Sequence, residues 1–263
     1  MLLGFDHQCP TLWIATITVH VNVSHPRGIL NMFDPLKMIR TAGVRRLEQA
    51  DLAVPKNNVE AWAIASGMTC VSSVASGHYV VAGEIEKKPW TIERKVGSRP
   101  FIQGDELTAR AALDVMTSPA VIVINRLLKE TLEEQAYKIY TESLHTFAEV
   151  GLSQEMRWLA LFPERPVVHL TQSFQDNFAV LSADNSDAVH WVSPEVADLI
   201  QQCQSEDFSI PFILMLIRGK VYLHRQLTLI NDEVPTVNNC VKLFKRACES
   251  AIDQFSSDSS GKL

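Results

Sequence analysis

The sequence predicts an α+β fold, with an antiparallel, hairpin-rich sheet, helices packed on one face and a division into two adjacent subdomains. Two observations favour this class. Short apolar segments flank tight turns, as in residues 210–217 and 220–229 around Arg218-Gly219. Longer segments, such as residues 128–150, carry apolar residues at spacings of three and four. Because strands joined by short turns pair antiparallel, a doubly wound parallel sheet is the less favoured alternative.

The first apolar segment alternates with period two. Apolar side chains recur on one side of residues 12–23, and polar side chains such as Thr18 and His20 recur on the other. This pattern is typical of a half-buried strand. Residues 1–6 contain no basic residue, so a signal peptide is not expected. A helix beginning at Asp34-Pro35 follows, because Asp is a good N-cap and Pro suits the first helical position.

The middle of the chain predicts a hairpin and a long helix. Residues 78–86 and 90–96 are strand candidates joined by Lys87-Lys88-Pro89. Residues 101–113 fit either a strand or a helix. A short β-branched run at 120–124 predicts a buried strand. The helix pattern at 128–150 follows it, with Gly151 at the position of a C-terminal cap.

The last hundred residues continue in the same style. Three helices are expected: one at 153–161, one that begins at the cap and proline Ser193-Pro194, and one at 237–255. A strand is expected at 178–181. Two prolines, Pro163 and Pro166, interrupt the chain before this part. We therefore expect an N-terminal α+β region at 1–163, a C-terminal α+β region at 164–255, and a frayed tail at 256–263.

The bulk composition is that of an ordinary globular protein. Of 263 residues, 46% are hydrophobic and 21% are charged, which is enough apolar content for a core. The formal net charge is −6, whereas dedicated nucleic-acid-binding proteins carry a strongly basic face. Nucleic acid is therefore an unfavoured partner. No run of about 18 apolar residues is present, so no transmembrane segment is expected.

The cysteines give no sign of a disulfide framework. Their number is odd and their positions are scattered: Cys9, Cys70, Cys203, Cys240 and Cys248. A framework needs an even number in a smaller domain, and a metal site needs ligands at converging spacings. The favoured interpretation is buried free thiols in a reducing compartment, and hence a cytoplasmic protein; a redox pair or metal site is the alternative.

Motifs that bind nucleotides or metals, or that carry a catalytic nucleophile, are missing from the sequence. It contains no glycine-rich phosphate-binding loop, no G-x-S-x-G elbow and no H-E-x-x-H. The acidic segment 184–187 lacks the glycine and closing glutamate of a calcium loop, and is better explained by a turn and a helix cap. We expect no cofactor and no metal, and the sequence assigns no catalytic residue.

One basic segment is a candidate binding site. Its residues are Lys87, Lys88, Trp90, Arg94, Lys95 and Arg99. Basic side chains interleaved with an aromatic ring suit an anion or a single-stranded nucleic acid, because charge follows the phosphates while the ring stacks on bases. Nearby glutamates, including Glu84 and Glu93, dilute the charge. A solvated hairpin face with Trp90 in the core is the alternative.

The C-terminal part, about residues 166–255, has a recognisable order of segments. It contains, in turn, Phe178-Ala179-Val180-Leu181-Ser182-Ala183-Asp184, Ala188, Ser193-Pro194, Lys220-Val221-Tyr222-Leu223 and a final helix. In this order it resembles uncharacterised bacterial domains of unknown function, some of them membrane-tethered. The pattern contains no functional motif. The resemblance implies a bacterial protein on the cytoplasmic side and implies no catalytic residue.

Three functions follow from these patterns. The leading hypothesis is a non-enzymatic interaction or regulatory module, acting on another protein or on itself through a sheet edge or an apolar groove. The second is a hydrolase-type enzyme whose acid/base site is assembled by the fold, with His78, Glu84, Glu93 or Asp105 as candidates. The third is weak binding of an anion or nucleic acid through the basic segment.

Overall fold

A computed structural model describes residues 58–73, 76–113, 115, 119–143, 153–205, 207–228 and 233–256. Contacts divide the chain into two units, residues 1–53 and 54–263, and every described residue belongs to the second. The strand expected at 12–23 and the helix expected from Asp34 lie outside the described residues. So do residues 257–263 of the expected tail.

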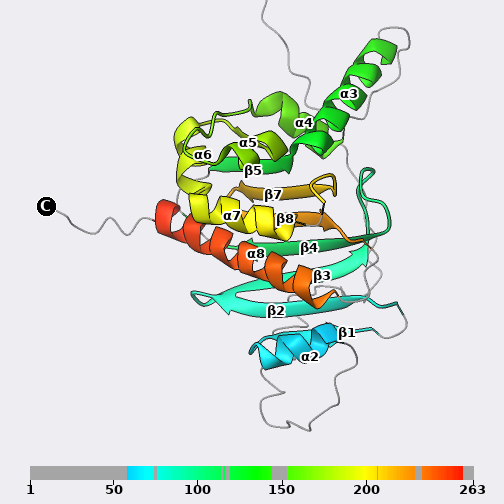
Figure 1. Ribbon diagram of the computed structural model, residues 1–263, viewed down its shortest axis with the longest axis vertical. Helices are drawn as coiled ribbons and strands as arrows, with labels where there is room; N and C mark the ends of the chain where they lie inside the picture. Colours follow the sequence, from blue (N-terminus) through cyan, green and yellow to red (C-terminus); the bar gives the residue numbers. More distant parts are fainter. Residues whose placement is uncertain are drawn as a thin grey trace, which may run out of the picture. The chain divides into compact units, whose positions relative to one another are not determined.

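The second unit is built on one antiparallel sheet, which confirms the predicted α+β class (Figure 1). Its eight strands lie in the order β1-β2-β3-β4-β8-β7-β5-β6, and every neighbouring pair is antiparallel. The strands are β1 (Thr69–Ser72), β2 (Tyr79–Ile85), β3 (Lys88–Val96), β4 (Asp105–Ala112), β5 (Ala120–Asn125), β6 (Phe178–Ser182), β7 (Phe212–Ile217) and β8 (Lys220–Gln226).

Two-residue turns close the hairpins β2–β3 and β7–β8. In the first, Glu86 and Lys87 have φ angles of 46° and 64°, and in the second, Arg218 and Gly219 have 51° and 68°. Consecutive left-handed residues give the turn whose twist matches that of the strands. The first turn is shorter than the sequence predicted, because Lys88 and Pro89 already belong to β3 and pair with β2.

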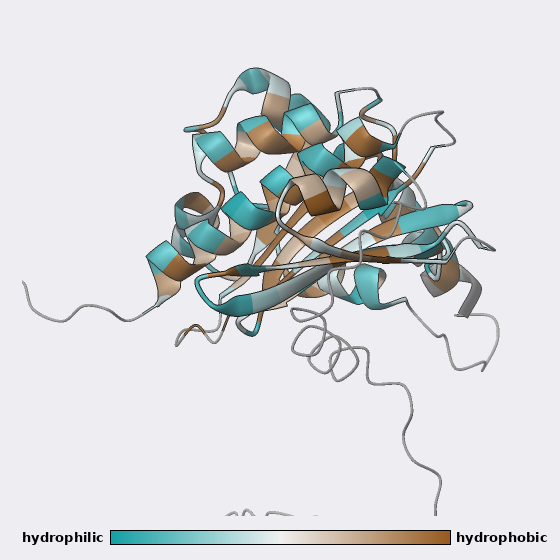
Figure 2. Ribbon diagram, turned by 90° about the horizontal axis from the view of Figure 1, so that it is seen from below, coloured by the Kyte–Doolittle hydropathy of each residue, from teal (hydrophilic) through white to brown (hydrophobic). Residues whose placement is uncertain are grey.

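Five of the described helices contribute buried residues to the core on one face of the sheet, which we call the first face. They are α2 (Asn58–Ala65), α5 (Gln172–Asn177), α6 (Asn185–Trp191), α7 (Pro194–Cys203) and α8 (Val234–Phe255). The indole Nε1 of Trp191 donates to the Ala247 carbonyl over 3.0 Å, and the Ser250 hydroxyl donates to the Trp191 carbonyl over 3.0 Å, so α6 is tied to α8. The central strands beneath these helices are predominantly hydrophobic (Figure 2).

Helices also cover the opposite face, which we call the second face, although the sequence predicted helices on one face only. Along β5, Val121 and Val123 join the core of the first face, whereas Ile122 and Ile124 join a separate core with α3 (Arg126–Ser143) and α4 (Gln154–Leu161). A fully apolar strand is the expected sequence of a strand covered on both sides. The fully apolar run at 120–124 in β5 is therefore a signal of the second covered face.

Several predicted caps are present. Ser193 accepts from the Val196 amide at the start of α7 with Pro194 in the first turn, and Asp184 accepts from the Ser186 amide at the start of α6. Ser153, which was not predicted as a cap, caps α4 in the same way. The ambiguous segment 101–113 contains β4, at 105–112. The elements α2, β1 and α5 were not predicted.

The two regions expected on either side of residue 163 share this sheet. Strands β8 and β7, from the second region, lie between β4 and β5, from the first. The boundary therefore does not separate two sheets, because two strands of the later region lie between strands of the earlier one. Within the described ranges, no helix is long and apolar enough to cross a membrane.

Candidate functional site

The residues of the basic segment do not share one surface. Lys87 is exposed in the β2–β3 turn, and Lys88 begins β3 half-buried. Trp90 is only 2% exposed and lies in the core of the first face, 6.3 Å from the ring of Phe244. Its ring is therefore not free to stack on a ligand, which agrees with the alternative that Trp90 is a core residue.

The remaining three basic residues of the segment, Arg94, Lys95 and Arg99, are engaged in ion pairs, Arg99 with Glu155 and Glu106. Arg94 pairs with Asp105, its Nε donating over 2.8 Å, and also pairs with Glu233. Lys95 pairs with Glu93 at 2.7 Å on the second face. The anion-binding hypothesis stays a prediction. These described residues do not lie together on one surface that could bind an anion.

The acid/base candidates do not converge either. His78 lies half-buried next to β2, and Glu84 is exposed on it. Glu93 accepts from the Thr108 hydroxyl on the second face, at 3.1 Å, whereas Asp105 pairs with Arg94. No two of the four share a hydrogen bond among the described contacts, so they form no acid/base pair of the kind that general catalysis requires.

A buried polar network lies instead on the second face, where β4 and β8 are adjacent. His224 Nδ1 lies 2.8 Å from Glu106 Oε1, and Arg99 places one terminal nitrogen 3.2 Å from His224 Nε2. Arg99 Nε is 3.0 Å from the carboxylate of Glu155 at the start of α4. The register of β4 and β8, which sets Thr108 opposite His224, brings these groups together from distant parts of the chain.

The contacts fix the protonation state of His224. Arg99 can only donate, so Nε2 of His224 accepts from it, and Nδ1 therefore carries the hydrogen that is donated to Glu106. Burial lowers the pKa of His224, and the charge of Arg99 lowers it further against the opposing effect of Glu106. Burial raises the pKa of Glu106, but His224 and Arg99 outweigh it, so that pKa lies below its ordinary value.

This network is enclosed. Glu106 has no exposed surface and His224 is 8% exposed, so neither group is open to a substrate. Its polar residues could be noticed in the sequence, because Glu106, Thr108 and Arg110 alternate with apolar residues in β4. What the sequence could not show is the register with β8 that joins them to His224.

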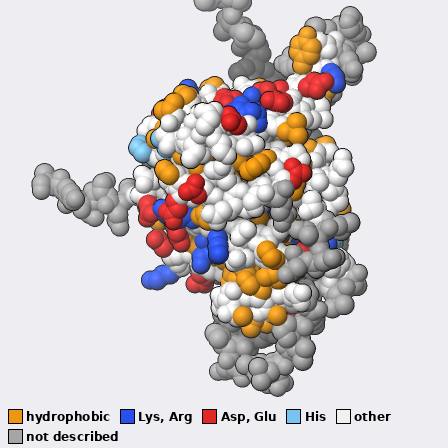
Figure 3. Space-filling model, viewed as in Figure 1, with side chains coloured by type: hydrophobic (Ala, Val, Ile, Leu, Met, Phe, Trp, Pro, Cys, Tyr) orange, Lys and Arg blue, Asp and Glu red, His pale blue; other side chains and the backbone are white. Residues whose placement is uncertain are grey.

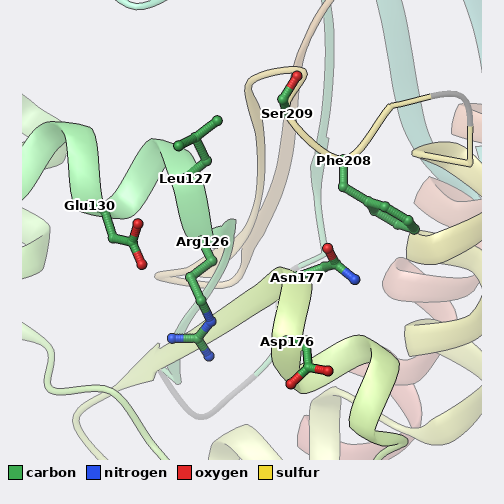
Figure 4. A pocket seen from close by; sticks show the side chains of 7 residues that line it. All are labelled: Arg126, Leu127, Glu130, Asp176, Asn177, Phe208 and Ser209. Carbon is green, nitrogen blue, oxygen red and sulfur yellow. The ribbon is translucent and has the colours of Figure 1, made fainter.

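A shallow pocket of about 280 Å³ opens at the start of α3 (Figure 4). Its lining residues are Arg126, Leu127, Glu130, Asp176, Asn177, Phe208 and Ser209. The guanidinium of Arg126 already donates to the carbonyls of Gln175 and Phe178. With its cation engaged and two carboxylates exposed, the pocket offers no converging set of ligand groups. Within the described ranges, no group of three or more His, Cys, Asp or Glu is arranged to hold a metal ion.

The two edges of the sheet differ. At β6, the segment 163–165 covers the edge: the Arg165 amide donates to the Val180 carbonyl over 2.8 Å, and the Ser182 amide donates to the Pro163 carbonyl over 3.1 Å. At the other end, β1 pairs with β2 through Thr69 to Ser72, and no further described strand pairs with its outer side. An open edge presents unpaired amides and carbonyls to another strand.

The helix beside this open edge exposes apolar side chains. In α2, Val59 and Ala63 are buried, yet Ile64 is 54% exposed and its neighbours Ala61 and Ala65 are also exposed. Val71 of β1 is 61% exposed. Figure 3 shows hydrophobic side chains gathered over this end of the described residues. We call α2 together with β1 the α2–β1 edge.

Comparisons with known proteins identify no relative by sequence. No family model matches the chain, and no curated protein matches it. Among solved structures, the chain is similar to the crystal structure of the mycobacterial trehalose monomycolate transport factor A, TtfA, with a TM-score of 0.40 and 8% sequence identity, over 73% of this chain and 91% of that one.

Proposed function

We propose that this protein is a non-enzymatic interaction module that self-associates through the α2–β1 edge. The observation that carries the proposal is the coincidence of an open strand edge with an exposed apolar helix at one end of the sheet. Exposed apolar side chains beside unpaired backbone groups are typical of a surface that adds a strand from a partner. We further propose a cytoplasmic location, because the five cysteines are odd in number and scattered along the chain, unlike the disulfide framework of a secreted protein.

Symmetry favours a second copy as the partner. Two β1 strands related by a two-fold axis perpendicular to the sheet pair antiparallel, which is the pairing used throughout this sheet. The axis leaves the first face of both sheets on the same side. Each α2 would therefore lie beside the other α2, and the Ile64 side chains of both copies would become buried in the interface.

The charges at this edge also support the proposal. Strand β1 contains no charged residue, and the single charged residue of α2, Glu60, accepts from the Ser72 hydroxyl over 2.6 Å. Open edges of monomeric proteins are commonly protected by charged residues, especially Lys. Neither like-charge repulsion nor the desolvation of a lysine opposes the approach of two such edges.

The test is the mass of the particle in solution. Light scattering after size-exclusion chromatography should give a dimer for the native chain. Val71→Lys and Ile64→Lys should each shift it to a monomer, since a lysine there would be buried against its own copy. Val168→Lys and Leu161→Lys, which change exposed apolar residues near the other end of the sheet, should leave the dimer unchanged.

Two results would count against the proposal. A native chain that is monomeric at every concentration tested would contradict self-association. A dimer that survives both Val71→Lys and Ile64→Lys would place the contact elsewhere. Should the monomer instead capture an extended peptide from another protein in a Val71-dependent way, the edge would be an interaction site but self-association would be wrong.

A further inference from the structure

We propose that Cys203 and Cys240 form a redox modification site, in which oxidation by a peroxide links α7 to α8 through a reversible disulfide. Their sulfur atoms are 2.8 Å apart. A disulfide requires about 2.05 Å between the sulfurs, so the two side chains need to approach by less than 1 Å. This inference is independent of the proposed self-association.

Helix packing brings the two thiols together. Cys203 is the last residue of α7 and Cys240 lies in the second turn of α8, and both belong to the buried stripes that hold these helices against each other. Two apolar stripes can be filled by aliphatic residues alone. Here the contact also includes a pair of side chains whose chemistry allows a covalent bond between the helices.

The other described cysteines lack such a partner. Cys248 is buried further along α8, and burial raises the pKa of its thiol well above the ordinary range. Cys70 lies half-buried in β1, where burial and the nearby charge of Glu60 raise its pKa to about 11. A sulfenic acid formed at either position would have no neighbouring thiol with which to condense. They therefore serve as matched controls.

The reaction balances with hydrogen peroxide as the oxidant. Cys203 is 4% exposed and Cys240 is fully buried, so Cys203 reacts first. Its thiolate attacks one peroxide oxygen, the O–O bond breaks, and the departing hydroxide takes the thiol's proton to give water and a sulfenic acid. The Cys240 thiolate then attacks the Cys203 sulfur. The S–O bond breaks, and the second hydroxide leaves as water with the proton of Cys240.

The experiment is an oxidation of the full chain, followed by alkylation under denaturing conditions and mass spectrometry. The reduced protein has five alkylatable cysteines. After peroxide treatment, two should be lost, the mass before alkylation should fall by about two hydrogens, and the linked peptides should contain Cys203 and Cys240. The bond spans 37 residues, so the melting temperature of the oxidised protein should rise by about 5 to 10 °C, reversibly with dithiothreitol.

Variants decide which thiols react. Cys203→Ala and Cys240→Ala should each abolish the intramolecular link, whereas Cys70→Ala and Cys248→Ala should leave it intact. Circular dichroism of each variant establishes that it is folded, and Cys203→Ser provides a second route if an alanine variant unfolds. Five alkylatable thiols after peroxide, a link through other cysteines, or over-oxidation of Cys203 with Cys240 still free would each overturn the proposal.

Discussion

His224 donates its Nδ1 hydrogen to Glu106 across 2.8 Å, between two strands that are more than one hundred residues apart in the chain. Arg99 donates to the other ring nitrogen, so the ring is neutral and has no vacant acceptor. Protonation at Nε2 would point an N–H at the guanidinium. The network is therefore stable only with His224 neutral and its hydrogen on Nδ1, so the stability of the fold depends on pH.

Removing the negative charge from this network should destabilise the fold. In Glu106→Gln, the amide cannot accept equally well from both His224 and Arg99, and a buried cation loses part of its compensation. We expect a loss of about 1–3 kcal/mol in the free energy of unfolding, measured by urea denaturation. The matched change Glu84→Gln, at an exposed residue of β2, should alter it by less than about 0.5 kcal/mol. Equal effects of the two changes would refute this role.

Acid should destabilise the protein through His224. Its pKa is lower in the folded state than in the unfolded chain, so the unfolded chain binds the proton more readily as the pH falls below about 6.5. The lowered pKa of Glu106 acts in the same direction at pH values below about 4.5. Stability from both groups is therefore present at neutral pH and is lost on acidification.

The measurement is the free energy of unfolding between pH 7.5 and 5.0, compared with that of His224→Gln. The native protein should lose stability over this range, and the variant should lose less of it. A variant with the same pH dependence as the native chain would show that other groups are responsible.

Gly83 makes room for the buried ring of Trp90. A Cβ atom at position 83 would lie 2.7 Å from Cζ2 of that ring, and the ring is enclosed by the core of the first face. Gly83→Ala should therefore cost about 1–3 kcal/mol of stability. Combining it with Trp90→Phe should cost less than the sum of the two changes, because the smaller ring relieves the contact. Strict additivity in a thermal or chemical denaturation cycle would argue against this contact.

Local rules predicted much of the fold. The cap and proline at Ser193-Pro194 start α7 as expected, and the turn at Arg218-Gly219 joins β7 and β8 as expected. Strand β1 was missed because four residues, half of them exposed, carry no readable period. The second helical face was missed although the sequence carries a signal for it, because the unbroken apolar run of β5 is typical of a strand covered on both sides.

The candidate site could not be predicted to the same extent. An open edge at β1 depends on the order of strands in the sheet, which is a long-range property that no local pattern contains. The His224–Glu106 contact depends on the register between β4 and β8 for the same reason. The basic segment was readable as a cluster in sequence, but alternation along β3 sends Arg94 and Lys95 to opposite faces.

Hydrogen exchange at Thr69 to Ser72 tests the proposed self-association most directly. In a dimer joined through β1, the amides of this strand that do not bond to β2 become protected, and their protection should rise with protein concentration. Val71→Lys should abolish that rise, whereas Val168→Lys should not. Exchange at β1 that is fast and independent of concentration in the native chain would contradict the account.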